Sequence, residues 1–244
     1  MSPPRDFVEL LAFGAHPDDV ELACGGLLLL MARRGYRFAI IDLTGGERSS
    51  RGDADTRAQE AKNAAAQLGA AGRECLGLPD TQLEATHGAV RIATEAIRRW
   101  RPKLVLCHDA GDQHPDHAAA ARIVHAAAFQ ASLHKAVADG EPHRVRRVVR
   151  YSRHTYFRPS FVVDISDVVE EKLAAVRCYA SQFDPTREGP ATPLTDAGFE
   201  DDLRAFWRFH GKQAGALYAE PYVIDGPPAL SDPVKDLCEE RRGF

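Results

Sequence analysis

Hydrophobic and polar residues alternate along this chain in two patterns. Short apolar runs are separated by longer segments in which apolar residues recur with the period of a helix. The runs predict strands near 8–14, 37–43, 73–77, 103–108, 146–151 and 161–165. The periodic segments predict helices at about 19–34, 55–69, 86–100, 116–138, 167–180 and 200–214. This order predicts an α/β fold, a three-layer sandwich in which helices cover a mostly parallel sheet.

Two loops contain more glycine, proline and charged residues than simple connections need, at 44–52 and 184–190. We expect both to form walls of a substrate site. The stretch from Asp225 onward has little apolar periodicity. The pattern therefore predicts a single domain over 1–224 and a C-terminal tail over 225–244, which wraps either the domain surface or a neighbouring subunit.

The composition narrows the class of protein. The chain has 244 residues, 44% of them hydrophobic, which is ample for one buried core. A net charge of −4 gives no electrostatic reason to expect nucleic acid. The five cysteines are scattered without a CxxC pair, as expected of small buried side chains in a reducing compartment. The apolar run 27–32 is too short for a membrane span, and the first residues lack an export pattern. We expect a cytoplasmic protein without membrane partners.

Imidazoles and carboxylates gather at two points of this pattern. His16-Pro17-Asp18-Asp19 follows the first predicted strand, and His114-Pro115-Asp116-His117 follows the strand at 103–108. In open α/β sheets ligands bind at the carboxyl ends of the strands, so the two clusters can meet in space. Any one aspartate alone could cap a helix, and any one histidine could be ordinary. Two such clusters, each with a proline at a strand end, favour a metal site at this edge.

Three of these residues form a plausible ligand set. A catalytic divalent ion typically takes three protein ligands and leaves one position open. His16, Asp19 and His117 would supply that set for a hard or borderline divalent ion, and Zn²⁺ and Fe²⁺ accept the same ligands. Asp18, His114 and Asp116 remain for other roles.

Other kinds of site fit the residues less well. Asp42 ends the second predicted strand, where an acid that binds a ribose could lie. However, the first turn carries a proline and two acids where a dinucleotide site needs glycines and free N–H groups. A set of two histidines and one carboxylate also suits non-haem iron oxygenases. The extra Asp18 favours hydrolysis, because it could accept a proton from the attacking water. A structural zinc site would need a fourth ligand, and none is evident.

The two motifs together resemble the LmbE-like (PIG-L) family of zinc-dependent N-acetylglucosamine deacetylases, which have a Rossmann-like fold. Further stretches resemble the bacillithiol-pathway branch, which converts N-acetylglucosaminyl malate to glucosaminyl malate. These stretches are 42–44 through 51–52, 78–80, 159–166, 181–183, 211–213 and 218–220. The resemblance implies an amide hydrolase acting on that conjugate, on another N-acetylglucosaminyl conjugate or on a thiol conjugate. It also implies a homo-oligomer.

The resemblance also implies roles for single residues. His16, Asp19 and His117 would bind zinc, and Asp18 would be the general base. His114, in its protonated form, would stabilise the oxyanion, with Asp116 orienting it. Arg51 would bind substrate, since a guanidinium suits the carboxylates of malate. Further arginines that could do so are Arg48, Arg153, Arg158 and Arg187.

Overall fold

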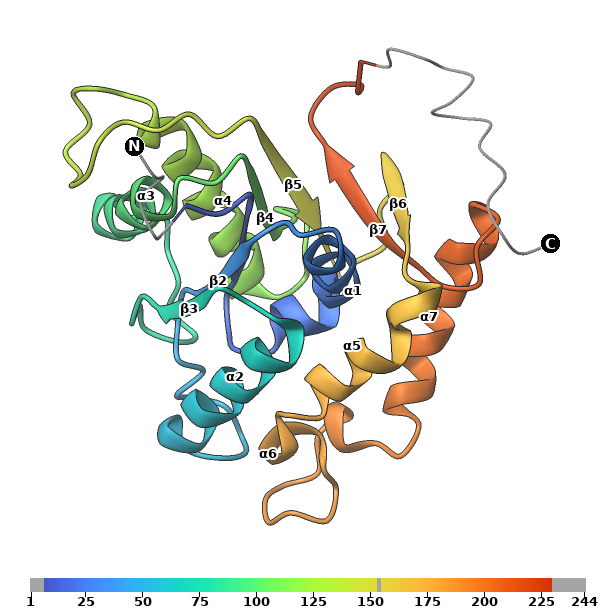
Figure 1. The fold of residues 1–244 in the computed structure, drawn as a ribbon. Helices are drawn as coiled ribbons and strands as arrows, with labels where there is room; N and C mark the ends of the chain where they lie inside the picture. Colours follow the sequence, from blue (N-terminus) through green and yellow to red (C-terminus); the bar gives the residue numbers. More distant parts are fainter. Residues whose placement is uncertain (1–6, 153–154, 230–244) are drawn as a thin grey trace.

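A computed structural model describes residues 7–152 and 155–229. Seven strands form one sheet in the order β3-β2-β1-β4-β5-β7-β6 (Figure 1). The strands are β1 Leu10–Gly14, β2 Phe38–Asp42, β3 Gly72–Cys75, β4 Leu104–His108, β5 Arg147–Tyr151, β6 Phe161–Asp164 and β7 Ala219–Ile224. The first five pair in parallel, whereas β7 runs antiparallel to both β5 and β6. The predicted α/β class with a mostly parallel sheet is confirmed.

The helices lie largely where the periodicity predicts them. They are α1 Asp19–Arg33, α2 Ala54–Leu68, α3 His87–Trp100, α4 Pro115–Ala131, α5 Val169–Val176, α6 Ala180–Phe183 and α7 Phe199–Gln213. Short 3₁₀ turns cover Ser166–Val168 and Pro193–Thr195. Gly69 adopts a left-handed conformation where α2 ends, which a glycine accepts without steric cost. The prediction for α4 was too long, because beyond Ala131 the apolar Leu133 and Val137 are exposed and have no core to cover.

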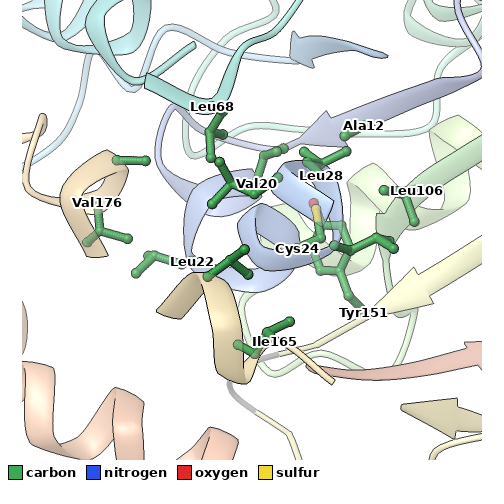
Figure 2. Packing of buried hydrophobic residues seen from close by; sticks show 14 of the residues in the cluster. Ala12, Val20, Leu22, Cys24, Leu28, Leu68, Leu106, Tyr151, Ile165 and Val176 are labelled. Atoms are coloured by element: carbon green, nitrogen blue, oxygen red, sulfur yellow. The ribbon is translucent and has the colours of Figure 1, made fainter. Parts of the chain in front are cut away.

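The strands β1, β2, β4 and β5 carry side chains into two separate cores. Leu10 and Ala12 of β1 pack with α1 and α5, while Leu11 and Phe13 pack with α3 and α4 on the opposite face. Figure 2 shows side chains of α1 between the sheet and α5. Both faces of β1 and β2 are buried, which explains why these strands read as continuous apolar runs.

The strand β7 was missed by the sequence analysis, since it includes an acid and a proline. Glu220 is fully buried and accepts hydrogen bonds from the backbone N–H groups of Gly26 and Leu27, each at 2.8 Å. Its Oε1 also lies 2.5 Å from Nζ of Lys172, which is fully buried too. Glu220 and Lys172 are 48 positions apart, so no local sequence pattern indicates that this acid is buried in a strand.

The remaining composition-based expectations have mixed outcomes. Cys24 and Cys107 are buried as predicted, but Cys75 is exposed and Cys178 is half-buried. Cys238 lies outside the described residues, as does most of the predicted tail. Within the described ranges, no helix combines the length and the apolar character needed to cross a membrane.

Candidate metal centre and active site

The first site segment is a tight turn between β1 and α1. Asp18 has a φ of 103°, in the left-handed region, and its side chain does not cap α1. The Asp19 carboxylate instead accepts a hydrogen bond from the backbone N–H of His16 at 2.8 Å. A Cβ at Gly14 would lie 2.9 Å from the carbonyl oxygen of His16. The turn therefore directs both aspartates toward the sheet edge, and helix capping does not account for Asp18.

The three predicted ligands converge across the sheet edge. Asp19 Oδ2 lies 3.6 Å from His16 Nδ1, and Asp19 Oδ1 lies 3.2 Å from His117 Nε2. A fourth residue joins them, since Asp19 Oδ2 is 3.1 Å from His108 Nε2. Three overlapping groups of residues have ligand atoms within 4.8 Å of one another. They are Asp19-His108-His117, His16-His114-His117 and His16-Asp80-Asp116.

Carboxylates hold the far side of two of these imidazoles. His16 Nε2 lies 3.1 Å from an oxygen of Asp80 and 3.1 Å from one of Asp116. His117 Nδ1 lies 3.3 Å from Asp112 Oδ1. Metal-binding histidines are typically oriented in this way, with one ring nitrogen on a carboxylate and the other on the ion. In both rings the nitrogen nearer Asp19 is the one left to face a metal.

The charges around the cluster favour a cation. Burial lowers the pKa of His16, but hydrogen bonds to Asp116, Asp19 and Asp80 outweigh this effect and raise it to about 12. Burial likewise opposes protonation of His117, yet the charge of Asp19 helps to raise its pKa to about 9. Burial alone would raise the pKa of Asp19, but His117 and His108 hold it well below its usual range. A donor set of imidazoles and carboxylates with this excess of acids fits a divalent ion.

Asp18 is the acid best placed to exchange a proton. It is buried, and burial raises its pKa to about 7 even though Arg57 acts in the opposite direction. Arg57 Nη2 lies 3.3 Å from Asp18 Oδ2 and also donates to the backbone carbonyl of Pro17. A general base works best with a pKa near the working pH, so the surroundings of Asp18 suit that role.

His114 differs from the predicted protonated donor. Burial and the neighbouring His117 and His16 lower its pKa, which favours the neutral ring. Its Nδ1 accepts a hydrogen bond from the backbone N–H of Asp116 at 3.2 Å, which assigns the ring proton to Nε2. His114 can therefore donate a hydrogen bond as a neutral imidazole.

Asp116 also has a different partner from the predicted one. Its carboxylate accepts hydrogen bonds from the backbone N–H groups of Thr81 and Leu83 at 2.8 and 3.2 Å, and it contacts His16 Nε2. The contact described above between Asp116 and His114 is made by the backbone N–H of Asp116 and not by its carboxylate. The Asp116 carboxylate thus contacts His16, and the backbone N–H of Asp116 binds the His114 ring.

A cavity of about 820 Å³ opens onto the cluster. Its lining includes His16, Asp18, Asp19, His114 and His117. Part of the predicted loop wall also lines it, from residues 46 and 48–51. The five predicted ligand and acid-base residues that line the cavity are thus brought together in one place.

Arg51, the predicted substrate clamp, lines the cavity but directs its guanidinium at the protein backbone. It is buried, and its guanidinium donates to four backbone carbonyls, those of residues 181, 184, 187 and 190. Donor to acceptor distances are 2.7 to 3.0 Å. The Arg51 side chain thus holds the second predicted loop in place. Arg48 also lines the cavity but is exposed, Arg158 and Arg187 are exposed, and Arg153 lies outside the described residues.

Replacing Arg51 by alanine is expected to lower the free energy of unfolding by about 2–4 kcal/mol, because several carbonyls would lose a charged donor. Urea unfolding measures this change. Arg48→Ala, in the same loop but exposed, is the matched control and should change stability by less than about 0.5 kcal/mol. Equal stability of the two variants would show that Arg51 does not organise the loop.

Asp42 has no free carboxylate for a ribose. Both of its oxygens bind the guanidinium of Arg73, at 2.6 and 2.8 Å, and the residue is buried. Arg73 also pairs with Glu21 at 2.5 Å. The dinucleotide interpretation is therefore excluded at this position.

Four residues of the site were not assigned a role by the sequence analysis. His108 is the last residue of β4, and Asp80 lies beyond β3, so the carboxyl-edge rule could have identified both. Asp112 has the same kind of position after β4. Arg57 lies within α2, where no local pattern distinguishes it from a surface arginine.

The fold and the site define an α/β protein with a candidate catalytic metal centre at the carboxyl edge of its sheet. The sequence model of the family "PIG-L: GlcNAc-PI de-N-acetylase" matches residues 11–128. Diacetylchitobiose deacetylase of Thermococcus kodakarensis is 31% identical over 233 residues, which are 89% of this chain and 83% of that protein. The chain belongs to the PIG-L family of deacetylases.

Two further relatives show how the family varies. The crystal structure of the conserved protein TT1542 from Thermus thermophilus has a TM-score of 0.84 and 37% identity, and the match covers 93% of this chain and 98% of that one. A 4-oxalmesaconate hydratase of Pseudomonas putida is 29% identical, over 70% of this chain and 73% of that protein. Similar chains thus include proteins described as a deacetylase and as a hydratase.

Proposed function

We propose that this protein is a metal-dependent N-deacetylase that removes acetate from an N-acetylglucosaminyl conjugate. The observation that carries this proposal is the position of Asp18. It is a buried acid with a pKa near neutrality, beside the imidazole and carboxylate donors and in the same cavity as His114. Zn²⁺ bound by His16, Asp19 and His117 would supply Lewis acidity, which acidifies a water molecule and polarises the acetyl carbonyl.

The residues of the chain would divide the remaining work. Asp18 accepts a proton from the attacking water, whose oxygen forms a bond to the acetyl carbon. His114 Nε2–H donates to the oxygen that becomes negative, since its Nδ1 is held by the backbone. The C–N bond then breaks, the sugar nitrogen takes the proton from Asp18, and acetate leaves. Asp80, Asp116 and Asp112 keep the His16 and His117 rings in position.

The sequence resemblance nominates N-acetylglucosaminyl malate as a substrate, in bacillithiol biosynthesis. Arg48 supports that choice, because it lines the cavity with an exposed side chain. The engagement of Arg51 by backbone carbonyls weakens it. The malate conjugate is therefore one substrate in the test below, beside diacetylchitobiose and simple N-acetylglucosaminides.

A hydratase is the second candidate, because one relative carries that description and the same groups could activate water for addition to a double bond. Mass spectrometry separates the two reactions. Deacetylation lowers the substrate mass by one acetyl group and releases acetate, whereas hydration adds one water to an unsaturated dicarboxylate.

The proposal predicts that chelated protein releases no acetate from any of these sugars and that Zn²⁺ restores the release. In a parallel experiment the chelated protein is reconstituted with Fe²⁺ under anaerobic conditions, and acetate release is measured again. Release of acetate by protein shown to be metal-free would contradict the metal requirement. Hydration of the dicarboxylate with no acetate from the sugars would favour the hydratase.

His114→Ala is expected to lower kcat by about 10²–10³, because the developing oxyanion loses a donor. Bound metal should stay at the wild-type level. The matched control is His125→Ala, a half-buried histidine on the same helix that does not line the cavity. An unchanged kcat for His114→Ala would remove this residue from the mechanism.

A further inference from the structure

The cavity has an apolar side in addition to its metal and acid residues. It is formed by side chains of α1, of the turn before α7 and of α7 itself. These residues, here called the apolar wall, are Leu22, Ala23, Leu194, Phe199, Leu203 and Phe206. The family match ends at residue 128, so four of the six lie beyond it. Most of the wall therefore lies in the C-terminal part of the chain, outside the segment that the family model matches.

The outer members of the wall present apolar surface to the cavity. Leu22, Phe199 and Leu203 are buried in the core behind it. Ala23, Leu194 and Phe206 pack against that core but are only half-buried. Covering the apolar surface of a cavity with an apolar ligand makes the free energy of binding more favourable.

The backbone that carries Leu194 is held firmly. Thr192 and Thr195 form a reciprocal pair of hydrogen bonds around the turn Pro193–Thr195. Just before this turn, the carbonyl of Pro190 accepts a hydrogen bond from Arg51 at 2.9 Å. The apolar wall is thus formed before any ligand arrives, which reduces the entropy lost on binding.

The apolar wall itself does not suit an anionic group. The lining of the cavity includes the acids Asp18, Asp80 and Asp202. Three arginines line it too. The guanidinium groups of Arg51 and Arg57 already bind backbone carbonyls, whereas Arg48 is an exposed residue of the 44–52 loop and does not belong to the apolar wall. A carboxylate placed against the apolar wall would lose its hydration with little compensation.

We infer that the apolar wall binds an uncharged, apolar aglycone, an aliphatic chain or an aromatic ring, attached to the acetylated amino sugar. This inference rests on the proposed deacetylation and names the part of the substrate that the metal centre does not contact. A cavity of about 820 Å³ is large enough for a sugar with such a group attached.

The test compares octyl and methyl N-acetyl-β-glucosaminide, with octyl below its micelle concentration, on zinc-loaded protein. The ratio of the two kcat/KM values should exceed about ten in favour of octyl, since several buried CH₂ groups contribute. Phe206→Ser should bring the ratio close to one, and Phe206→Leu should restore most of it. Phe209→Ser is the control, because Phe209 lies on the same helix with 52% exposure and outside this cavity. Thermal unfolding confirms that each variant is folded.

Two results would overturn the inference while leaving the deacetylase proposal intact. One is equal kcat/KM for octyl and methyl, and the other is a preference for the malate conjugate over octyl. If none of the sugars released acetate, the deacetylase proposal would fail. Calorimetric binding of octyl and methyl N-acetyl-β-glucosaminide would still test whether the apolar wall binds an apolar aglycone. About tenfold tighter binding of octyl that Phe206→Ser abolishes would support it, and equal binding would overturn it.

Discussion

Asp18→Asn is expected to lower kcat for acetate release by about 10²–10⁴ while the protein keeps its full content of metal. Asparagine has nearly the same shape but cannot accept a proton from water. The Asp18 carboxylate pairs with Arg57 and is not one of the proposed metal ligands. Removing its charge therefore leaves the ligand set complete. Acetate release, measured beside metal content, checks both parts of the expectation.

Asp202→Asn is the matched control for this variant. Asp202 lines the same cavity but is exposed on α7, and its neutralisation should change kcat less than about threefold. If Asp18→Asn kept wild-type turnover, Asp18 would not be the base. If it lost its metal, and turnover returned when metal was added in excess, the residue would belong to the ligand set.

Asp19→Asn should show the opposite phenotype, with Zn²⁺ affinity lower by at least about 100-fold. Asp19 contacts His16, His108 and His117, so its charge lies at the centre of the donor set. Competition with a chromophoric chelator measures the affinity. Asp18→Asn serves as the neighbouring control, because it makes the same chemical change one residue away.

The adjacent aspartates thus provide a reciprocal test. The account requires Asp19→Asn to lose metal and Asp18→Asn to lose turnover. Wild-type affinity in Asp19→Asn would show that the ion is held by another group of donors, such as His16, Asp80 and Asp116.

The sequence predicted those parts of the fold that local patterns encode. β1 and β2 are buried on both faces and therefore appear as continuous apolar runs. α3 has a buried face at helical spacing, with Thr86 as its N-cap. β7 could not be predicted in this way, because the partners that make Glu220 acceptable lie in α1 and α5. Such compensation depends on distant residues.

The same distinction applies to the site. The turn at 16–19 and the turn at 114–117 were placed correctly, since a strand end followed by a helix fixes where their side chains go. The partners of individual side chains were not predictable. Arg51 and Arg57 are six residues apart and look alike in the sequence, yet one binds a loop and the other binds Asp18. Asp116 likewise contacts His16, a hundred residues away.

The most direct test of the central claim is hydrolysis of an N-acetylglucosaminide in H₂¹⁸O, with acetate and amine analysed by mass spectrometry. The account predicts one ¹⁸O atom in each acetate, none in the amino sugar, and acetate and amine in equal amounts. The zinc-loaded wild-type protein should give this result, and metal-free protein and Asp18→Asn should give almost no product. Unlabelled acetate, or equal release by Asp18→Asn, would contradict a mechanism in which Asp18 takes a proton from the attacking water.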